Sequence, residues 1–177
     1  QKAARDFAIN ECLPGVIERD EHQKFPKEQI EKLADLGFMG MMVSPEYGGS
    51  GMDTISYVIA MEEISKIDAS VSVCMSVNNS LVCYGMQEFC NEEQKKKYIP
   101  KLASGEWAAA YCLTEPGAGS DALGAKTTAT LSEDGKHWIL NGQKMWITNA
   151  GFADLYTVFA KIDGKEFTGF LVERETP

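Results

Sequence analysis

The stretch Tyr111-Cys112-Leu113-Thr114-Glu115-Pro116-Gly117-Ala118-Gly119-Ser120-Asp121 decides how this chain is interpreted. It continues an apolar run that begins at Trp107 and predicts a strand. After the strand come a hydroxyl, a carboxylate and a proline, and then a loop of small residues. Because small residues leave the backbone uncovered, amide N–H groups in such a loop can converge on an anion. The stretch therefore predicts an anion-binding loop at the end of a strand.

A second informative stretch, Asn141-Gly142-Gln143-Lys144-Met145-Trp146-Ile147-Thr148-Asn149, follows further along the chain. Its Asn-Gly pair predicts a tight turn, and Gln143–Thr148 is predicted to be a strand. Residues two apart on a strand share a face, so Trp146 and Thr148 are expected side by side. An indole can form the wall of a pocket for an aromatic ring, and a threonine hydroxyl can donate a hydrogen bond to a ring nitrogen.

The glycines of the first stretch also fit a dinucleotide fingerprint, G-x-G-x-x-A, over residues 117–122. That fingerprint needs a helix directly after the glycines, so that the pyrophosphate lies at the helix N-terminus. Residues 123–131 are instead rich in threonine and alternate in polarity, which predicts a strand. Pro116 also removes a backbone donor from the turn. We therefore interpret the glycine stretch as a loop of a β-domain.

The first hundred residues have the apolar spacing of helices. Helices are expected at Ala3–Ile17 with a break at Pro14-Gly15, at Lys27–Leu36, Thr54–Ile67 and Ala69–Tyr84, and from Asn91 through Leu102. Asp68 is an N-cap candidate, and Asn91 with Gln94 has the form of a capping box. The short apolar run Phe38–Val43 predicts a buried extended segment, and residues 44–51 predict a loop.

From residue 107 onward the polarity alternates with a period near two, which predicts strands. They are expected at Ala108–Leu113, Lys126–Leu131, His137–Leu140, Gln143–Thr148, Leu155–Ile162 and Thr168–Glu173, with hairpin-type turns at Asp134-Gly135, Asn141-Gly142 and Asp163-Gly164. We therefore predict an α+β fold. An all-helical N-terminal domain, residues 1–106, is followed by a β-barrel-like domain, residues 107–177, that is incomplete at its C-terminal end.

Composition excludes several classes of protein. The formal net charge of −9 argues against a nucleic-acid partner, because phosphate binding requires a basic face. No apolar run is long enough for a transmembrane helix, so no membrane partner is expected. The N-terminal residues 1–7 are amphipathic and contain an acid, unlike a signal peptide. The five cysteines form no C-x-x-C pair, which favours free thiols, and the two histidines are too few for a metal site.

Together, residues 111–121 and 141–149 resemble the FAD-binding segments of the acyl-CoA dehydrogenase family, and the resemblance extends from the N-terminus to residue 177. It is closest to the short-chain, butyryl-type members. The resemblance implies that FAD is contacted by eight residues of this chain: Tyr111, Leu113, Thr114, Gly119, Ser120, Trp146, Ile147 and Thr148. It also implies that Ser120 contacts the acyl-CoA substrate.

The resemblance further implies an oxidoreductase of fatty acid β-oxidation. Such enzymes remove the α-proton of an acyl-CoA with a carboxylate and pass the β-hydride to flavin N5, which produces a trans-2-enoyl-CoA. The electrons then pass to an electron-transfer flavoprotein. The carboxylate lies in the family's C-terminal domain, so no catalytic residue is expected among residues 1–177, and Glu115 is interpreted as a structural part of its loop. A homotetramer or dimer is implied, in the bacterial cytoplasm or the mitochondrial matrix.

Three alternatives stay open at this point. An acyl-CoA oxidase or a flavin monooxygenase of the same fold would keep similar flavin-binding segments, and a non-catalytic module would keep only the fold.

Residues 75–81 resemble the helix that lines the acyl cavity of straight-chain family members. Val73 and Val77 are therefore candidates for setting the depth of that cavity, or else they are ordinary helix–helix core.

Overall fold

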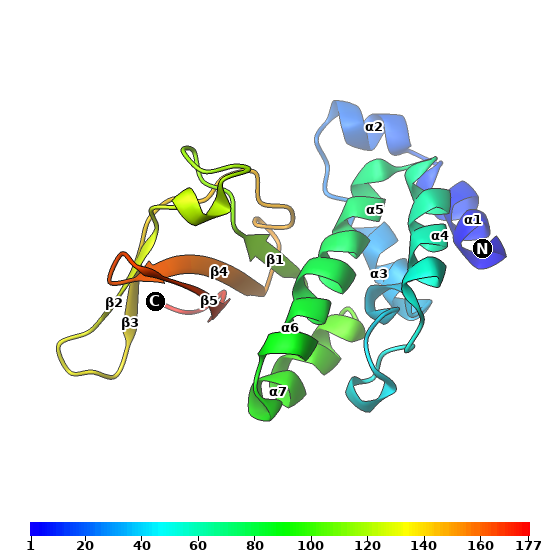
Figure 1. The fold of residues 1–177 in the computed structure, drawn as a ribbon. Coiled ribbons are helices and arrows are strands. Elements are labelled where there is room, and N and C mark those ends of the chain that lie inside the picture. The colour runs from blue at the N-terminus through cyan, green and yellow to red at the C-terminus, as the bar shows by residue number, and fades with distance from the viewer. The chain divides into compact units, whose positions relative to one another are not determined.

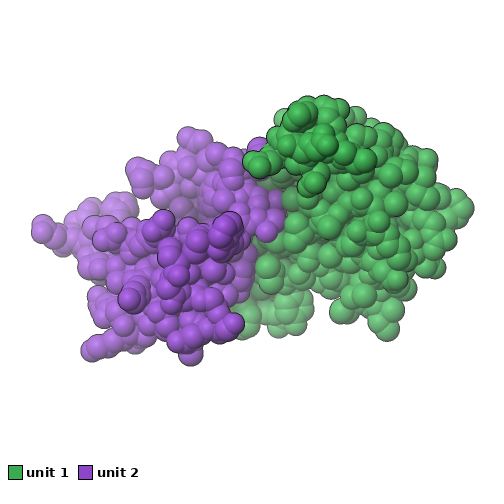
Figure 2. Space-filling model, turned by 90° about the horizontal axis from the view of Figure 1, so that it is seen from above, with its two compact units in different colours: residues 1–108 green, residues 109–177 purple.

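The computed structural model describes residues 1–177, which form two compact units, Gln1–Ala108 and Ala109–Pro177. The first unit is built from helices and the second from strands (Figure 1), and Figure 2 shows the two units in different colours. The chain therefore has the predicted order of a helical part followed by a sheet. No helix combines the length and the apolar character that crossing a bilayer requires.

The helical unit contains seven α-helices and four shorter helical segments. The α-helices are α1 (Lys2–Phe7), α2 (Val16–Glu21), α3 (Lys27–Asp35), α4 (Thr54–Ser65), α5 (Ala69–Ser76), α6 (Tyr84–Phe89) and α7 (Glu92–Ala103). The short segments are the π-helices η1 (Ala8–Cys12) and η4 (Val77–Cys83) and the 3₁₀-helices η2 (Phe38–Gly40) and η3 (Pro45–Tyr47). The residues joining α5, η4 and α6 keep right-handed helical dihedrals, so these three form one continuous helical run (Figure 1).

The core of this unit forms where α4 and the α5 run pack together with α1 and α3. Its buried members include Phe7, Leu33, Ile64, Val71 and Met75. Burial of such side chains contributes about 1.5–3 kcal/mol each to folding. The five cysteines of the chain are all free thiols, and only Cys90 is not fully buried.

The predicted caps are confirmed. The Asp68 carboxylate accepts a hydrogen bond from the Val71 amide at 3.1 Å at the start of α5. At the start of α7, Asn91 and Gln94 form a reciprocal capping box, in which the two bonds measure 2.9 and 3.1 Å. These bonds satisfy backbone N–H groups that have no partner within their own helix.

The prediction of an extended segment at Phe38–Val43 is wrong. The segment begins as the 3₁₀-helix η2 and continues as a turn. Two of its carbonyls are satisfied by the side chains of two buried asparagines from η4. The Asn78 amide donates to the Met39 carbonyl at 2.9 Å, and the Asn79 amide donates to the Phe38 carbonyl at 2.8 Å. Because side chains replace a neighbouring strand as partner, the apolar run is buried without being extended.

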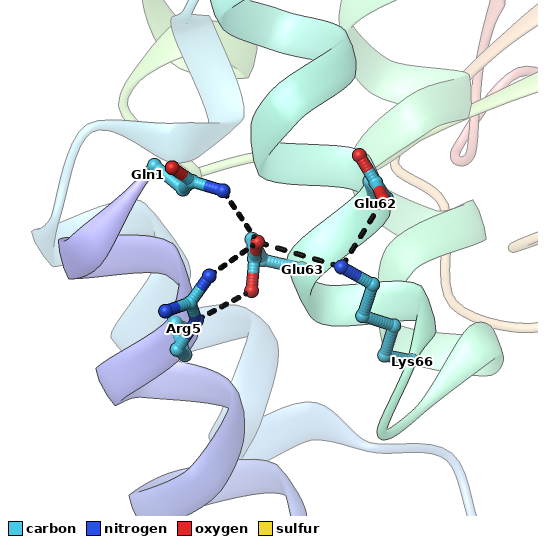
Figure 3. A network of polar contacts seen from close by, with 5 residues as sticks. All are labelled: Gln1, Arg5, Glu62, Glu63 and Lys66. Atoms are coloured by element: carbon cyan, nitrogen blue, oxygen red, sulfur yellow. Dashed lines mark hydrogen bonds and ion pairs between the residues drawn. The ribbon is translucent and has the colours of Figure 1, made fainter.

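A buried carboxylate, Glu63, joins α1 to α4 (Figure 3). Arg5 donates to both of its oxygens, from Nε at 2.8 Å and from Nη2 at 2.9 Å, and the Gln1 amide donates at 2.8 Å. The Glu63 side chain is 3% exposed, whereas neighbouring Glu62 is 62% exposed and pairs only with Lys66. The hydrogen bonds from Arg5 and Gln1 lower the pKa of Glu63 to about 2, against the opposing effect of burial.

This lowered pKa predicts an acid-sensitive contribution to stability. The ordinary pKa of the group is 4.5, so folding favours its ionised form. Its stabilisation is complete above that value and is lost as the pH falls toward about 2. We expect Glu63→Gln to lower the melting temperature near neutral pH, with a difference from wild type that shrinks in acid. Thermal melts of the full-length protein across this range test the prediction, with Glu62→Gln as the matched surface control. A difference that does not change with pH contradicts it.

The second unit is a five-stranded mixed sheet formed by β1 (Ala109–Cys112), β2 (Thr128–Leu131), β3 (Trp138–Asn141), β4 (Leu155–Ile162) and β5 (Glu166–Glu173). Strand β5 pairs antiparallel with the whole length of β4. The other edge of β4 is shared by two parallel partners, since β1 pairs with residues 155–158 and β2 pairs with residues 161–162. Strand β3 then extends β2 in an antiparallel hairpin. These pairings produce an open mixed sheet in this part of the chain.

Two of the three predicted hairpin turns are confirmed. Asp134-Gly135 lies between β2 and β3, and Asp163-Gly164 lies between β4 and β5. The second turn has positive φ at both residues, 49° and 73°, as a type I′ turn requires. Asn141-Gly142 does not close a hairpin, because no strand follows it directly.

The predicted strand Gln143–Thr148 is therefore wrong. Trp146 has φ 59° and Asn149 has φ 68°, and these left-handed conformations do not fit in an extended strand. The segment forms an irregular connection between β3 and β4. Consequently Trp146 and Thr148 do not share a strand face, and the prediction that they lie side by side on a strand is wrong.

Candidate functional site

The candidate site begins at β1, whose residues alternate between the two faces of the sheet. Ala110 and Cys112 are buried in a small cluster with Ala153, against which Ile147 packs. Tyr111 lies on the opposite face, where its ring centre is 4.9 Å from that of Phe159. The parallel register of β1 with β4 thus fixes where the chain leaves the sheet at Leu113 and Thr114.

The loop after β1 begins with a tight turn and then opens to solvent. Glu115 and Ala118 exchange two backbone hydrogen bonds at 3.0 and 3.1 Å. Gly117, Gly119 and Ser120 are exposed, and a Cβ placed on either glycine would meet no atom within 4 Å. The space beside this part of the backbone is therefore open within the chain, as a cradle for an anionic group requires.

The side chain of Glu115 turns away from the open loop and is almost fully buried. Its carboxylate accepts hydrogen bonds from the Lys126 amide at 2.6 Å, the Thr127 amide at 3.0 Å, the Thr127 hydroxyl and the Lys144 ammonium at 2.8 Å. Burial by itself raises the pKa of Glu115, but these donors outweigh it and hold the pKa at about 2. A carboxylate so fully bonded does not serve as a base, in agreement with its interpretation as a structural part of the loop.

The second stretch is bonded on both sides of Trp146 to β1 and to the residues that directly follow β1. At one end the Met145 amide donates to the Thr114 carbonyl at 3.0 Å, and the Lys144 ammonium donates to the Leu113 carbonyl at 3.1 Å. At the other end the side-chain amide of Asn149 donates to the backbone carbonyl of Ala109, in β1, at 3.0 Å. These bonds bring together two stretches that are distant in sequence.

Trp146 lies between these anchors and is 84% exposed. A large aromatic side chain in a left-handed backbone conformation is unusual, and such conformations concentrate at functional sites. Because the ring is exposed, Trp146 is not part of the sheet core. Its neighbour Ile147 is the member of this segment that packs into the core.

The eight predicted site residues therefore fall into two groups. The end of β1 and the segment around Trp146 are joined by direct hydrogen bonds, so Leu113 and Thr114 lie beside that segment. Gly119 and Ser120 lie further along the loop, on the far side of the Glu115–Ala118 turn. Asp121 stabilises that end of the loop, since its carboxylate accepts from the Gly124 amide at 3.2 Å at the 3₁₀-helix η5 (Ala122–Gly124).

Three residues with bonds in this region were not identified from the sequence: Lys144 and Asn149, which join the second stretch to β1 and the residues after it, and Thr127, whose amide and hydroxyl donate to Glu115. Lys144 lies within the second stretch, but a lysine by itself does not indicate a buried ion pair, because lysine side chains are mostly exposed. Asn149 offered a usable signal, since asparagine is enriched in left-handed conformations, as it is here. Nothing local indicated Thr127, whose partner lies in another loop.

In the helical unit, the two valines considered for an acyl cavity differ in environment. Val77 is buried and belongs to the helix core, whereas Val73 is 43% exposed. The two neighbouring asparagines of η4 are occupied in holding η2. Val77 is therefore a core residue of this unit, and a part for either valine in setting the depth of an acyl cavity stays a prediction.

The chain matches two family models over nearly its whole length. Residues 1–106 match the model for the acyl-CoA dehydrogenase N-terminal domain, and residues 110–177 match the model for the middle domain. A relative from Clostridium acetobutylicum, called acyl-CoA dehydrogenase, short-chain specific, is 42% identical over 178 residues; the match covers 98% of this chain and 46% of the relative.

Solved structures also match nearly the whole chain, at similar sequence identity. Butyryl-CoA dehydrogenase from Megasphaera elsdenii has a TM-score of 0.92 at 42% identity, over 99% of this chain and 48% of that one. Acyl-CoA dehydrogenase from Bacillus anthracis, solved in complex with FAD, has a TM-score of 0.92 at 44% identity, over 98% of this chain and 30% of that one. The chain thus spans less than half the length of these proteins.

Proposed function

The chain belongs to the acyl-CoA dehydrogenase family, and from this premise we propose that its full-length protein is an FAD-dependent dehydrogenase of acyl-CoA thioesters. The reaction would convert an acyl-CoA to the trans-2-enoyl-CoA. The observation that carries the proposal is the exposed ring of Trp146, held in a left-handed conformation beside the end of β1. An exposed indole of this kind can form one wall for the flavin ring.

The residues of the site fit FAD better than a smaller flavin. The open backbone at Gly117–Ser120 suits a pyrophosphate, which FAD has and FMN lacks. In this proposal Gly119 and Ser120 bind the pyrophosphate, the Trp146 indole lines the flavin ring, and Ile147, whose side chain packs into the core, contacts the flavin through its backbone. The remaining contacts come from Tyr111, Leu113, Thr114 and Thr148, the two threonines supplying hydroxyl donors.

The flavin would supply the hydride acceptor, and these residues would hold it in place. The Trp146 indole would exclude water from one side of the ring, and the hydroxyl groups of Thr114 and Thr148 would donate to ring heteroatoms and so favour electron-rich forms of the ring. Ser120 is proposed to contact the acyl-CoA as well. Removal of the α-proton is assigned, as the family implies, to a carboxylate outside residues 1–177; Glu115 is not proposed for this role, because it already accepts four hydrogen bonds.

The finer assignments rest on the family alone. We place an electron-transfer flavoprotein as the electron acceptor and a homotetramer or dimer as the assembly. The short-chain preference is supported by the names of the relatives, which include short-chain and butyryl-CoA dehydrogenases. No residue of the helical unit is assigned to chain-length selection.

The cofactor part of this proposal predicts that the full-length protein purifies with FAD. Acid release followed by chromatography identifies the flavin, and recovery of FMN or of no flavin contradicts the prediction.

The reaction is tested by adding butyryl-CoA under anaerobic conditions, which should bleach the flavin absorbance as the enoyl-CoA forms. A flavin that stays oxidised with every acyl-CoA points to a non-catalytic module. If the reduced flavin is reoxidised rapidly by oxygen and not by an electron-transfer flavoprotein, the protein is an oxidase.

A further inference from the structure

A buried ion pair connects the two stretches that form the proposed flavin site. Lys144 belongs to the second stretch, and both of its partners, the Glu115 carboxylate and the Leu113 carbonyl, belong to the first. The two side chains are only 12% and 6% exposed. The Lys144 ammonium is therefore a non-covalent crosslink between the strand end that leads into Thr114 and the segment that carries Trp146.

Local stability alone does not account for this arrangement. Glu115 accepts three other hydrogen bonds, from the Lys126 amide and from the amide and hydroxyl of Thr127, so its carboxylate has partners without Lys144. Burying an ammonium group is costly, and an ion pair repays that cost only when its geometry is good. What Lys144 adds is a link across the site, next to the single backbone bond from the Met145 amide to the Thr114 carbonyl.

We infer that Lys144 is a positioning residue for the flavin, an inference that rests on the proposed function. It acts through its neighbours, because it fixes the separation between the Trp146 wall and the Thr114 end of β1. Two rigidly joined segments present their groups to a ring at a fixed spacing, and small displacements of such groups weaken binding steeply.

The experiment compares Lys144→Met with Thr127→Val in the full-length protein. Thr127→Val removes a donor from the same carboxylate, but Thr127 lies in neither stretch and the crosslink stays. The flavin is removed in acid, and the apoprotein is titrated with FAD. Lys144→Met should raise the FAD Kd at least about tenfold and alter the visible circular dichroism of the bound flavin. Thr127→Val should lower the melting temperature and leave both flavin signals close to wild type. The exposed Lys165 provides the surface control Lys165→Met.

Equal effects of Lys144→Met and Thr127→Val on the FAD Kd overturn the inference, since they show only a loss of stability. An unchanged Kd in Lys144→Met also overturns it. If Lys144→Met does not fold, Lys144→Arg decides, because it keeps the charge and changes the length of the crosslink. We then expect a shifted Kd and spectrum, and values equal to wild type count against the inference. A wild-type protein that binds no FAD refutes the proposed function itself, which separates the two failures.

Discussion

Glu115→Ala is expected to lower the free energy of unfolding by about 3–5 kcal/mol, as does the removal of one partner from other buried ion pairs. The substitution leaves the Lys144 ammonium buried beside the Leu113 carbonyl without its counter-charge. It also removes the acceptor of the Lys126 and Thr127 amides. Because the Lys144 side chain is 12% exposed and Thr127 is buried, solvent does not replace the lost carboxylate at these two residues.

Urea unfolding of the full-length protein, followed by the fluorescence of its tryptophans, measures this effect. Glu133→Ala is the matched control, since Glu133 is exposed in the same unit and its substitution is expected to stay within about 0.5 kcal/mol of wild type. Glu115→Gln should fall between the two, because it keeps one acceptor oxygen. A loss below about 1 kcal/mol in Glu115→Ala, within the range of an ordinary hydrogen bond, would show that the pair is open to water.

Trp146→Ala is expected to weaken FAD binding by about 10- to 100-fold, the range found when an aromatic side chain that stacks on a heterocyclic ring is removed. The same variant should leave the flavin-free protein about as stable as wild type, because the ring is 84% exposed and contributes little to the core. Alanine is as unfavourable as tryptophan at φ 59°, so the backbone strain is unchanged. The substitution thus separates binding from folding.

The matched control is Trp138→Ala on β3, where the residue is 44% exposed and the centre of its ring lies 5.8 Å from that of Phe170. This variant should show the reverse pattern, with a lower melting temperature of the flavin-free protein and an FAD Kd near wild type. Apoprotein titrations and thermal melts of both variants provide the comparison. The assignment of Trp146 as the flavin wall fails if its removal leaves the FAD Kd unchanged.

Features that depend on a few consecutive residues were predictable from the sequence. Asp68 and Asn91 are helix caps as their side-chain chemistry indicates, since the bonds that they form close within three residues. Asp163-Gly164 forms its hairpin turn because its two residues tolerate positive φ. The order of helices followed by strands and the membership of the family also follow from local patterns and motifs. The sequence by itself thus determined the kind of fold and indicated the two stretches of the proposed site.

The geometry of the site was decided by the tertiary structure. The alternating polarity of residues 143–148 predicted a strand. In the structure, hydrogen bonds to Leu113, Thr114 and Ala109 give this segment an irregular path, and the Trp146 side chain is exposed to solvent. In the same way, Asn78 and Asn79 convert an apolar run into a tight turn by bonding to its carbonyls. The physical reason is the same in both places. A backbone or charged group that loses water must find a partner, and when that partner is distant in sequence no local preference reveals it.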